Sequence, residues 1–106
     1  MAAQAKKYTL TLSEEDRLYI EFQTSKNRVT HFVIQYHSLT SRGWRTIIRY
    51  DTAHGLGVAH KDVYVYSRRK KTRQEILGDD FNAIFTRAIR EVRNNWKKIK
   101  ENYLLQ

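Results

Sequence analysis

The chain has 106 residues, a formal net charge of +9, no cysteine and no proline. This length fits one domain, and the absence of cysteine excludes disulfides, zinc–thiolate centres and thiol catalysis. The charge lies just beyond the magnitude of about 2–8 that is usual for a small soluble domain, which predicts a nucleic-acid partner. The alternative is that the charge serves solubility alone.

Alternating apolar residues over the first two thirds of the chain predict an antiparallel arrangement of short strands. The expected strands cover residues 8–12, 18–22, 28–38, 44–50 and 62–67. Residues 1–7 are expected to form a flexible lead-in, and Thr40–Gly43 is expected to form a hairpin turn. In the fourth strand the alternation predicts Arg45, Ile47 and Arg49 on one face of the sheet.

A long amphipathic helix is predicted from about Asp79 to about Asn102, with Asp79 as its N-cap. Apolar residues recur at spacings of three and four along it, which indicates a single buried stripe. The opposite face of this helix carries a series of cations: Arg87, Arg90, Arg93, Lys97, Lys98 and Lys100. The lysines also suit the C-terminal end of the helix dipole, so part of this pattern has a structural explanation.

The expected fold is therefore α+β: a single domain in which an antiparallel meander of about five strands packs against one long C-terminal amphipathic helix. The helix would cover one face of the sheet and leave the other face open to water or to a partner. No apolar run approaches the roughly 18 residues of a membrane span, and the N-terminus lacks the apolar core of a signal peptide. A cytoplasmic protein without a membrane partner is expected.

The segment between residues 50 and 62 concentrates chemistry-bearing side chains. It contains Asp51, His54, His60 and Asp62 beside two glycines. Histidines can move protons near neutral pH, so His54 and His60 are candidates for acid–base catalysis of RNA cleavage, oriented by the two aspartates. Two imidazoles and two carboxylates would also suit a metal ion. A third reading is an ordinary strand connection, and we predict neither a metal nor another cofactor.

Cations that could hold a phosphate lie around this segment and further along the chain. Arg45, Arg49 and Lys61 are the candidates nearest to the histidines. The predicted nucleic-acid-binding set also includes Arg68, Arg69, Lys70, Lys71, Arg73, Arg87 and Arg90. The five cations between residues 68 and 73 repel one another unless an anion neutralises them, although a solvated turn would explain them equally well.

Two further patterns concern the strands. His31 and His37 are six residues apart and are therefore expected on the same face of the third strand, where hydrogen-bonded surface histidines are the usual outcome. Several strand tyrosines alternate with basic residues, and exposed tyrosines can stack on nucleic-acid bases. More often such a tyrosine is half-buried and packs against the core.

The region from Phe32 to Val92 resembles the TumE-like toxins of bacterial and archaeal toxin–antitoxin systems and related domains of unknown function. In that pattern a strand ends in Tyr-Asp-Asn, a Gly-x-Gly turn and a His-x-His motif follow, and a helix opens near Asp-Phe. The matching positions here are Tyr50-Asp51, Gly55-x-Gly57, His60 and Asp80-Phe81. A related version, Arg-Tyr-Asp-x-Ala-His-Gly, fits residues 49–55 directly.

The chain departs from the first pattern in three places. Thr52 replaces the asparagine, one extra residue separates Gly57 from His60, and Asp62 stands where the second histidine would be. The resemblance implies a cytoplasmic toxin that cleaves RNA and pairs with an antitoxin protein, with RNA preferred over DNA as the target. A binding module without catalysis, or a basic domain that meets an acidic protein, remains the alternative, and a homodimer is left open.

Overall fold

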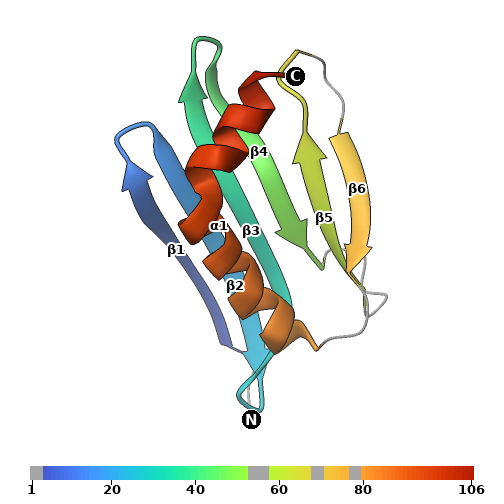
Figure 1. Ribbon diagram of the computed structural model, residues 1–106. Coiled ribbons are helices and arrows are strands. Elements are labelled where there is room, and N and C mark those ends of the chain that lie inside the picture. Colours follow the sequence, from blue (N-terminus) through green and yellow to red (C-terminus); the bar gives the residue numbers. More distant parts are fainter. Residues whose placement is uncertain (1–3, 53–57, 68–70, 77–79) are drawn as a thin grey trace.

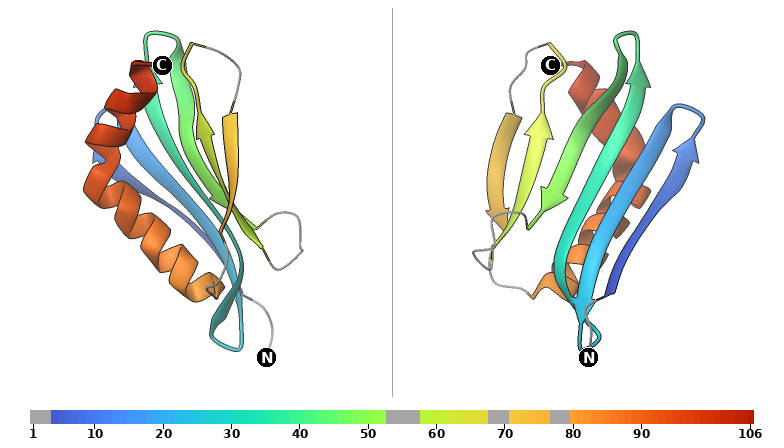
Figure 2. Two further views of the ribbon diagram at one scale, coloured as in Figure 1. Left: turned by 45° about the vertical axis from the view of Figure 1, so that its right-hand side comes forward. Right: turned by 180° about the vertical axis from the view of Figure 1, so that it is seen from behind.

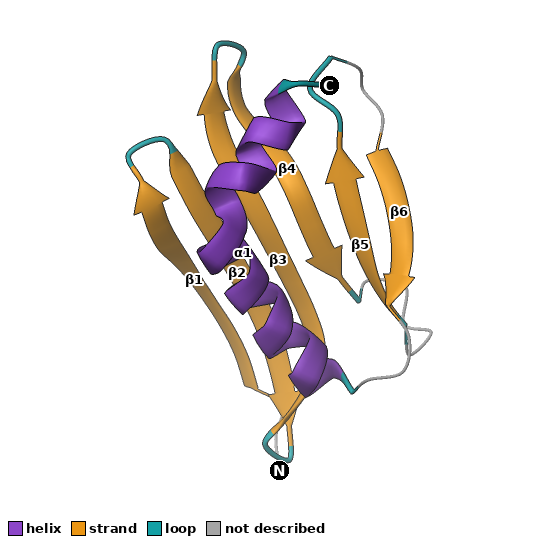
Figure 3. Cartoon of the chain, in the orientation of Figure 1, coloured by secondary structure: helices purple, strands orange, loops and turns teal. Residues whose placement is uncertain are grey.

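The computed structural model describes residues 4–52, 58–67, 71–76 and 80–106 and shows a six-stranded antiparallel sheet with one helix across it (Figures 1 and 3). The strands are β1 (Gln4–Ser13), β2 (Asp16–Ser25), β3 (Arg28–Thr40), β4 (Gly43–Asp51), β5 (Ala59–Tyr64) and β6 (Lys71–Ile76), and the helix is α1 (Phe81–Leu104). Neighbours in sequence are neighbours in the sheet, so the fold is a meander. The predicted α+β class is confirmed.

Both edges of the sheet extend beyond the prediction. The sheet has six strands rather than about five, because β6 occupies the place of an expected basic connection. At the other edge, the expected flexible lead-in is wrong for Gln4–Lys7, which pair with β2 from Thr24 to Glu21. In both segments most side chains are polar and exposed, and the ladder of backbone hydrogen bonds holds the strand in place.

The helix begins one residue later than its expected cap. Asp80, rather than Asp79, has the extended backbone of an N-cap, and its Oδ1 accepts a 2.8 Å hydrogen bond from the N–H of Ala83. This bond satisfies one of the free N–H groups of the first turn. Asp79 lies outside the described residues. Within the described part of the chain, no helix is long and apolar enough to cross a membrane.

The hydrophobic core lies between α1 and one face of the sheet, and no helix of the described residues covers the opposite face (Figure 2). Alternate residues of the central strands point toward α1, which is why they are fully buried. The strands contribute Leu18, Ile20, Ile34 and Tyr36 to this core, among others. The helix contributes Ile84, Ala88, Val92 and Tyr103. We call the face of the sheet away from α1 the open face.

A β-bulge in β4 interrupts the alternation of its side chains. Tyr36 of β3 pairs with Ile48, but the next residue, His37, pairs with Thr46, so Ile47 is the extra residue. Because side chains alternate with a period of two, one extra residue exchanges the faces of all the residues on one side of it.

This bulge separates two arginines that the alternation places together. Arg49 pairs with Gln35 and lies on the open face, whereas Arg45 pairs with Ser38 and lies on the face toward α1. The prediction that Arg45 and Arg49 share a face is therefore wrong. The same exchange moves Trp44 to the open face.

A second bulge lies at the start of β3. The β2–β3 register shifts by one residue at Gln23, which leaves His31 on the open face but turns Val29 toward α1. The N–H of Val29 donates a 2.7 Å hydrogen bond to Oδ1 of Asn82 in the helix. Val29 therefore does not share a face with His31, contrary to the simple alternation, while His31 and His37 do share one, as predicted.

Candidate nucleic-acid interface

The outward side of α1 carries exposed cations along most of its length. Because its apolar stripe packs against the sheet, the charged residues between the stripe positions face solvent. We call this set the basic face of α1: Arg87, Arg90, Arg93, Lys97 and Lys98, all of them exposed. Among the described residues, no carboxylate forms an ion pair with Arg90, Arg93, Lys97 or Lys98.

The carboxylate in the middle of α1 is turned toward the sheet. Glu91 accepts a 2.6 Å hydrogen bond from the hydroxyl of Tyr50 and a 3.0 Å ion-paired bond from Nζ of Lys61. Burial opposes ionisation of Glu91, but these two bonds hold its pKa below the ordinary value. Burial and the bond to Glu91 raise the pKa of Tyr50, which therefore remains a donor. Glu91 thus pairs with Lys61, and it forms no ion pair with Arg90, Arg93, Lys97 or Lys98.

A shallow hollow of about 570 Å³ lies beside the N-terminal half of α1. Three arginines line it: Arg28 from the start of β3, and Arg87 and Arg90 from the helix. Asp80 lies at its edge and binds Arg28 through a 2.9 Å ion pair, in which both side chains are largely exposed. Exposed pairs of this kind are weak, so Arg28 can exchange Asp80 for a phosphate at little cost.

The open face holds most of the predicted catalytic cluster. In the β4–β5 register Arg49 pairs with Asp62 and Asp51 pairs with His60, so these four residues lie on one face of two neighbouring strands. Asp51, His60 and Asp62 are all buried, with no more than 8% of each exposed. His54 lies outside the described residues.

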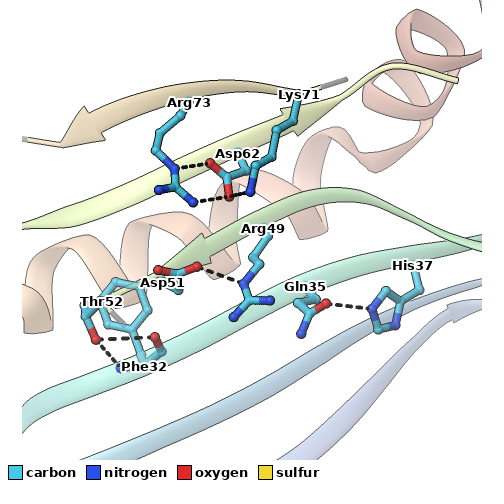
Figure 4. A network of polar contacts seen from close by, with 9 residues as sticks. All are labelled: Phe32, Gln35, His37, Arg49, Asp51, Thr52, Asp62, Lys71 and Arg73. Carbon is cyan, nitrogen blue, oxygen red and sulfur yellow. Dashed lines mark hydrogen bonds and ion pairs between the residues drawn. The ribbon is translucent and has the colours of Figure 1, made fainter. Parts of the chain in front are cut away.

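Asp62 is held by two cations of the edge strand (Figure 4). Nε of Arg73 donates a 2.9 Å hydrogen bond to its Oδ1, and Nζ of Lys71 donates a 3.2 Å bond to its Oδ2. The bond from Arg73 is the main cause that lowers the pKa of Asp62, with a further contribution from Lys71 against the effect of burial. Asp62 is therefore a fixed anion, and Lys71 and Arg73 already have a carboxylate partner.

Asp51 is paired within its own strand. Nε of Arg49 donates a 2.8 Å hydrogen bond to Oδ2 of Asp51, two residues further along β4 (Figure 4). The Asp51 side chain is buried, whereas about a third of the Arg49 side chain remains exposed. The two Nη groups of Arg49 make no hydrogen bond to any described residue, so they remain available to an anion on the open face.

A family model covers residues 2–106, nearly the whole chain. The chain belongs to the DUF7718 family, described as a domain of unknown function. No curated protein and no solved structure matches the sequence at a significant level. The family description names no activity, so the resemblance to TumE-like toxins stays a prediction.

The structure divides the other predicted phosphate ligands of this DUF7718 domain between two faces. Arg49 lies beside His60 on the open face, but Arg45 and Lys61 lie on the face toward α1, and Lys61 binds Glu91 there. Arg45 and Lys61 therefore cannot act with His60 as one site in this arrangement. The bulge explains the position of Arg45, and strict alternation with Asp62 explains that of Lys61.

Part of the predicted site cannot be placed. Arg68, Arg69 and Lys70, like His54, lie outside the described residues. In the described part of the chain, no group of three or more histidine and carboxylate side chains could hold a metal ion. Lys100, which the helical pattern assigns to the basic face, instead binds the buried Asp16 at 3.3 Å.

Sequence reasoning missed Arg28 as a neighbour of the helix cations. Arg28 follows a turn in which Lys26 and Asn27 both have positive φ, 53° and 62°, as in the tight hairpins that reverse a strand within two residues. The turn alone gives no signal for this contact. The contact forms because the packing of α1 across the sheet brings the N-cap Asp80 to Arg28 at the start of β3.

Proposed function

We propose that this protein binds RNA through the basic face of α1. The observation that carries the proposal is the one-sided charge of the helix: among the described residues no carboxylate forms an ion pair with four of its outward cations, Arg90, Arg93, Lys97 and Lys98. Its central carboxylate, Glu91, is bonded inward. On the open face, by contrast, the cations Arg49, Lys71 and Arg73 are paired with buried aspartates.

The geometry of the basic face suits a phosphate backbone. A helix of 24 residues is about 36 Å long at 1.5 Å per residue, so its cations can contact several successive phosphates. Binding of this kind gains free energy from the release of condensed counterions and carries little sequence information. RNA is proposed over DNA on the strength of the TumE-like resemblance.

Binding to a fluorescent single-stranded RNA tests the proposal. The variant Arg90→Gln/Arg93→Gln/Lys97→Gln removes three cations of the basic face, and it should weaken binding on the order of tenfold or more at moderate salt. The matched control, Lys6→Gln/Lys7→Gln/Lys26→Gln, removes the same charge from exposed positions elsewhere. Equal weakening by both variants would show that net charge, rather than the helix, is responsible. A DNA strand of the same sequence tests the preference for RNA.

A second candidate function is RNA cleavage on the open face, as expected of a TumE-like toxin. The observation in its favour is that His60 and Asp51 lie opposite each other, with Arg49 beside them. In this reading His60 and His54 exchange protons with the RNA, and Arg49 holds the scissile phosphate. An acidic antitoxin would then bind the basic face of α1.

Histidine variants separate the two functions. His54→Ala and His60→Ala should abolish both RNA cleavage and growth arrest if the protein is a ribonuclease, while RNA binding through α1 should remain. His31→Ala is the matched control, because His31 is an exposed histidine of the same face. RNA that stays intact in the presence of the unaltered protein, while binding it, would reject catalysis and leave the binding function in place.

A further inference from the structure

The open face contains an aromatic and basic patch around Trp44 and Arg17, two residues that neither proposed function uses. Trp44 is 38% exposed, although tryptophan is usually among the most buried residues of a domain. The bulge at Ile47 places it on the open face instead of in the core. The guanidinium carbon of Arg17 lies 4.0 Å from the centre of its ring, so the indole is held flat against a cation.

The surroundings of Trp44 favour an anion. Arg17 pairs in register with His37, which in turn pairs with Thr46 on the next strand. Among the described residues, no carboxylate forms an ion pair with Arg17. Arg49 lies on the same face on the other side of β3, two strand spacings, or roughly 10 Å, across the sheet from Arg17 and two residues along it. Two cations thus flank the central strand.

His37 adds a polar group that lacks a partner. Its Nε2 lies 3.1 Å from Oε1 of Gln35, whereas its buried Nδ1 has no hydrogen-bond partner among the described residues. Burial, and secondly the charge of Arg17, lower the pKa of His37, so its ring is neutral at physiological pH. A neutral ring leaves the positive charge of the patch to the two arginines. Because its Nε2 donates to Oε1 of Gln35, its Nδ1 is a hydrogen-bond acceptor.

We infer that this patch binds a nucleotide of single-stranded RNA, with the base stacked on Trp44 and the phosphates held by Arg17 and Arg49. The inference rests on the proposed RNA binding and adds a preference for unpaired bases. Base stacking on an exposed aromatic ring is the usual way in which proteins hold single strands, and paired bases cannot offer the same face. The side chains of Gln35 and Thr46, on the same open face, offer hydrogen bonds to the base edges.

Two properties of the chain make the inference directly measurable. It contains two tryptophans, and Trp96 is half-buried on α1 with its ring 6.5 Å from that of Tyr36 in the core. The variant Trp96→Phe therefore leaves Trp44 as the sole indole and reports on the open face alone. Titration with an oligouridine of about twelve nucleotides, within the usual site size of single-strand binders, should quench its emission. A duplex of the same length should leave the emission unchanged.

Substitutions in the patch complete the experiment. Trp44→Ala and Arg17→Gln should weaken oligouridine binding about 5- to 100-fold, the range of stacking on one base, whereas Trp44→Phe should keep most of the affinity. Leu39→Ala is the control, because Leu39 is a similarly exposed apolar residue that pairs with Trp44. Circular dichroism confirms that each variant is folded.

Three outcomes would overturn the inference: unchanged oligouridine affinity in Trp44→Ala, equal quenching by the duplex, or quenching by an acidic polyglutamate peptide but not by RNA. The last result would assign the patch to a protein partner. Failure of the α1 proposal has a different signature. If the basic-face variant binds like the unaltered chain while Trp44→Ala loses affinity, the patch remains and the helix is excluded.

Discussion

The hydroxyl of Tyr50 donates a 2.6 Å hydrogen bond to Glu91 and joins the middle of α1 to β4. This contact has two consequences. It fixes the helix against the sheet, and it withdraws the central carboxylate of α1 from the outward side. Lys61 binds the same carboxylate through an ion pair, so a second contact also keeps Glu91 turned inward.

Loss of this hydroxyl should destabilise the fold without weakening RNA binding. Tyr50→Phe leaves one oxygen of a half-buried carboxylate without its donor, which should cost about 1–3 kcal/mol of unfolding free energy. Urea denaturation followed by circular dichroism measures the change. Tyr64→Phe is the control, since the described residues provide no hydrogen bond to the Tyr64 hydroxyl. A loss of RNA affinity in the folded Tyr50→Phe protein would show that the ion pair with Lys61 alone does not keep Glu91 turned inward.

A larger effect is expected at Asp16, which is 2% exposed at the start of β2. The hydroxyls of Ser13, Tyr36 and Ser38 donate hydrogen bonds of 2.7, 2.6 and 2.7 Å to it, and Nζ of Lys100 of α1 lies 3.3 Å away. Burial alone would raise the pKa of Asp16, but these partners together lower it. The carboxylate therefore ties the C-terminal half of α1 to the sheet.

Asp16→Ala should lower the free energy of unfolding by about 3–5 kcal/mol, because it leaves one lysine and three hydroxyls without their shared carboxylate partner. Thermal denaturation measures the loss, and Glu15→Ala, an exposed neighbour, should change stability by less than about 0.5 kcal/mol. Similar melting temperatures for the two variants would show that Lys100 and the hydroxyls find other partners.

The pairing of Asp62 predicts a specific dependence on pH. Its pKa is lower in the folded chain than the ordinary value of about 3.9, so the carboxylate stabilises the fold at pH values above that value. This stabilisation is lost as the pH falls through the folded pKa. Asp62→Asn should therefore lower stability at neutral pH, by about 1–3 kcal/mol, and flatten the decline of stability below about pH 4.

Urea denaturation at several pH values between neutral and acidic checks this prediction. Glu75→Gln is a suitable control, because Glu75 is an exposed carboxylate of the same strand as Arg73. An acid transition of unchanged steepness in Asp62→Asn would mean that other carboxylates, such as Asp16, account for the loss of the fold in acid.

The sequence predicts the helix and the central strands well for a simple physical reason. Burial imposes a period of 3.6 on α1 and of 2 on β2 and β3, and both periods are visible in the residues. The strand β6 was missed because five of its six residues are exposed and only Ile76 carries an apolar signal. An edge strand of this kind is held by backbone bonds, which leave no pattern in the side chains.

The candidate site, like the sheet, could be predicted only in part from the sequence. The sequence places Asp51, His60 and Asp62 close together along the chain, but their common position on the open face comes from the β4–β5 register. The pairing of Asp62 with Arg73 requires β6 and could not be foreseen. The exposure of Trp44 requires the bulge at Ile47, whose extra residue is defined only by the pairing with β3. These long-range contacts decide which face each side chain uses.

The salt dependence of RNA binding tests the central claim most directly. Each neutralised phosphate contributes about 0.7 to the slope of log affinity against log salt for a single strand. If α1 is the interface, Arg90→Gln/Arg93→Gln/Lys97→Gln should lower the slope by about 2, whereas Lys6→Gln/Lys7→Gln/Lys26→Gln should leave it unchanged. Equal slopes for the unaltered chain and the basic-face variant, or an equal decrease in both variants, would contradict the account.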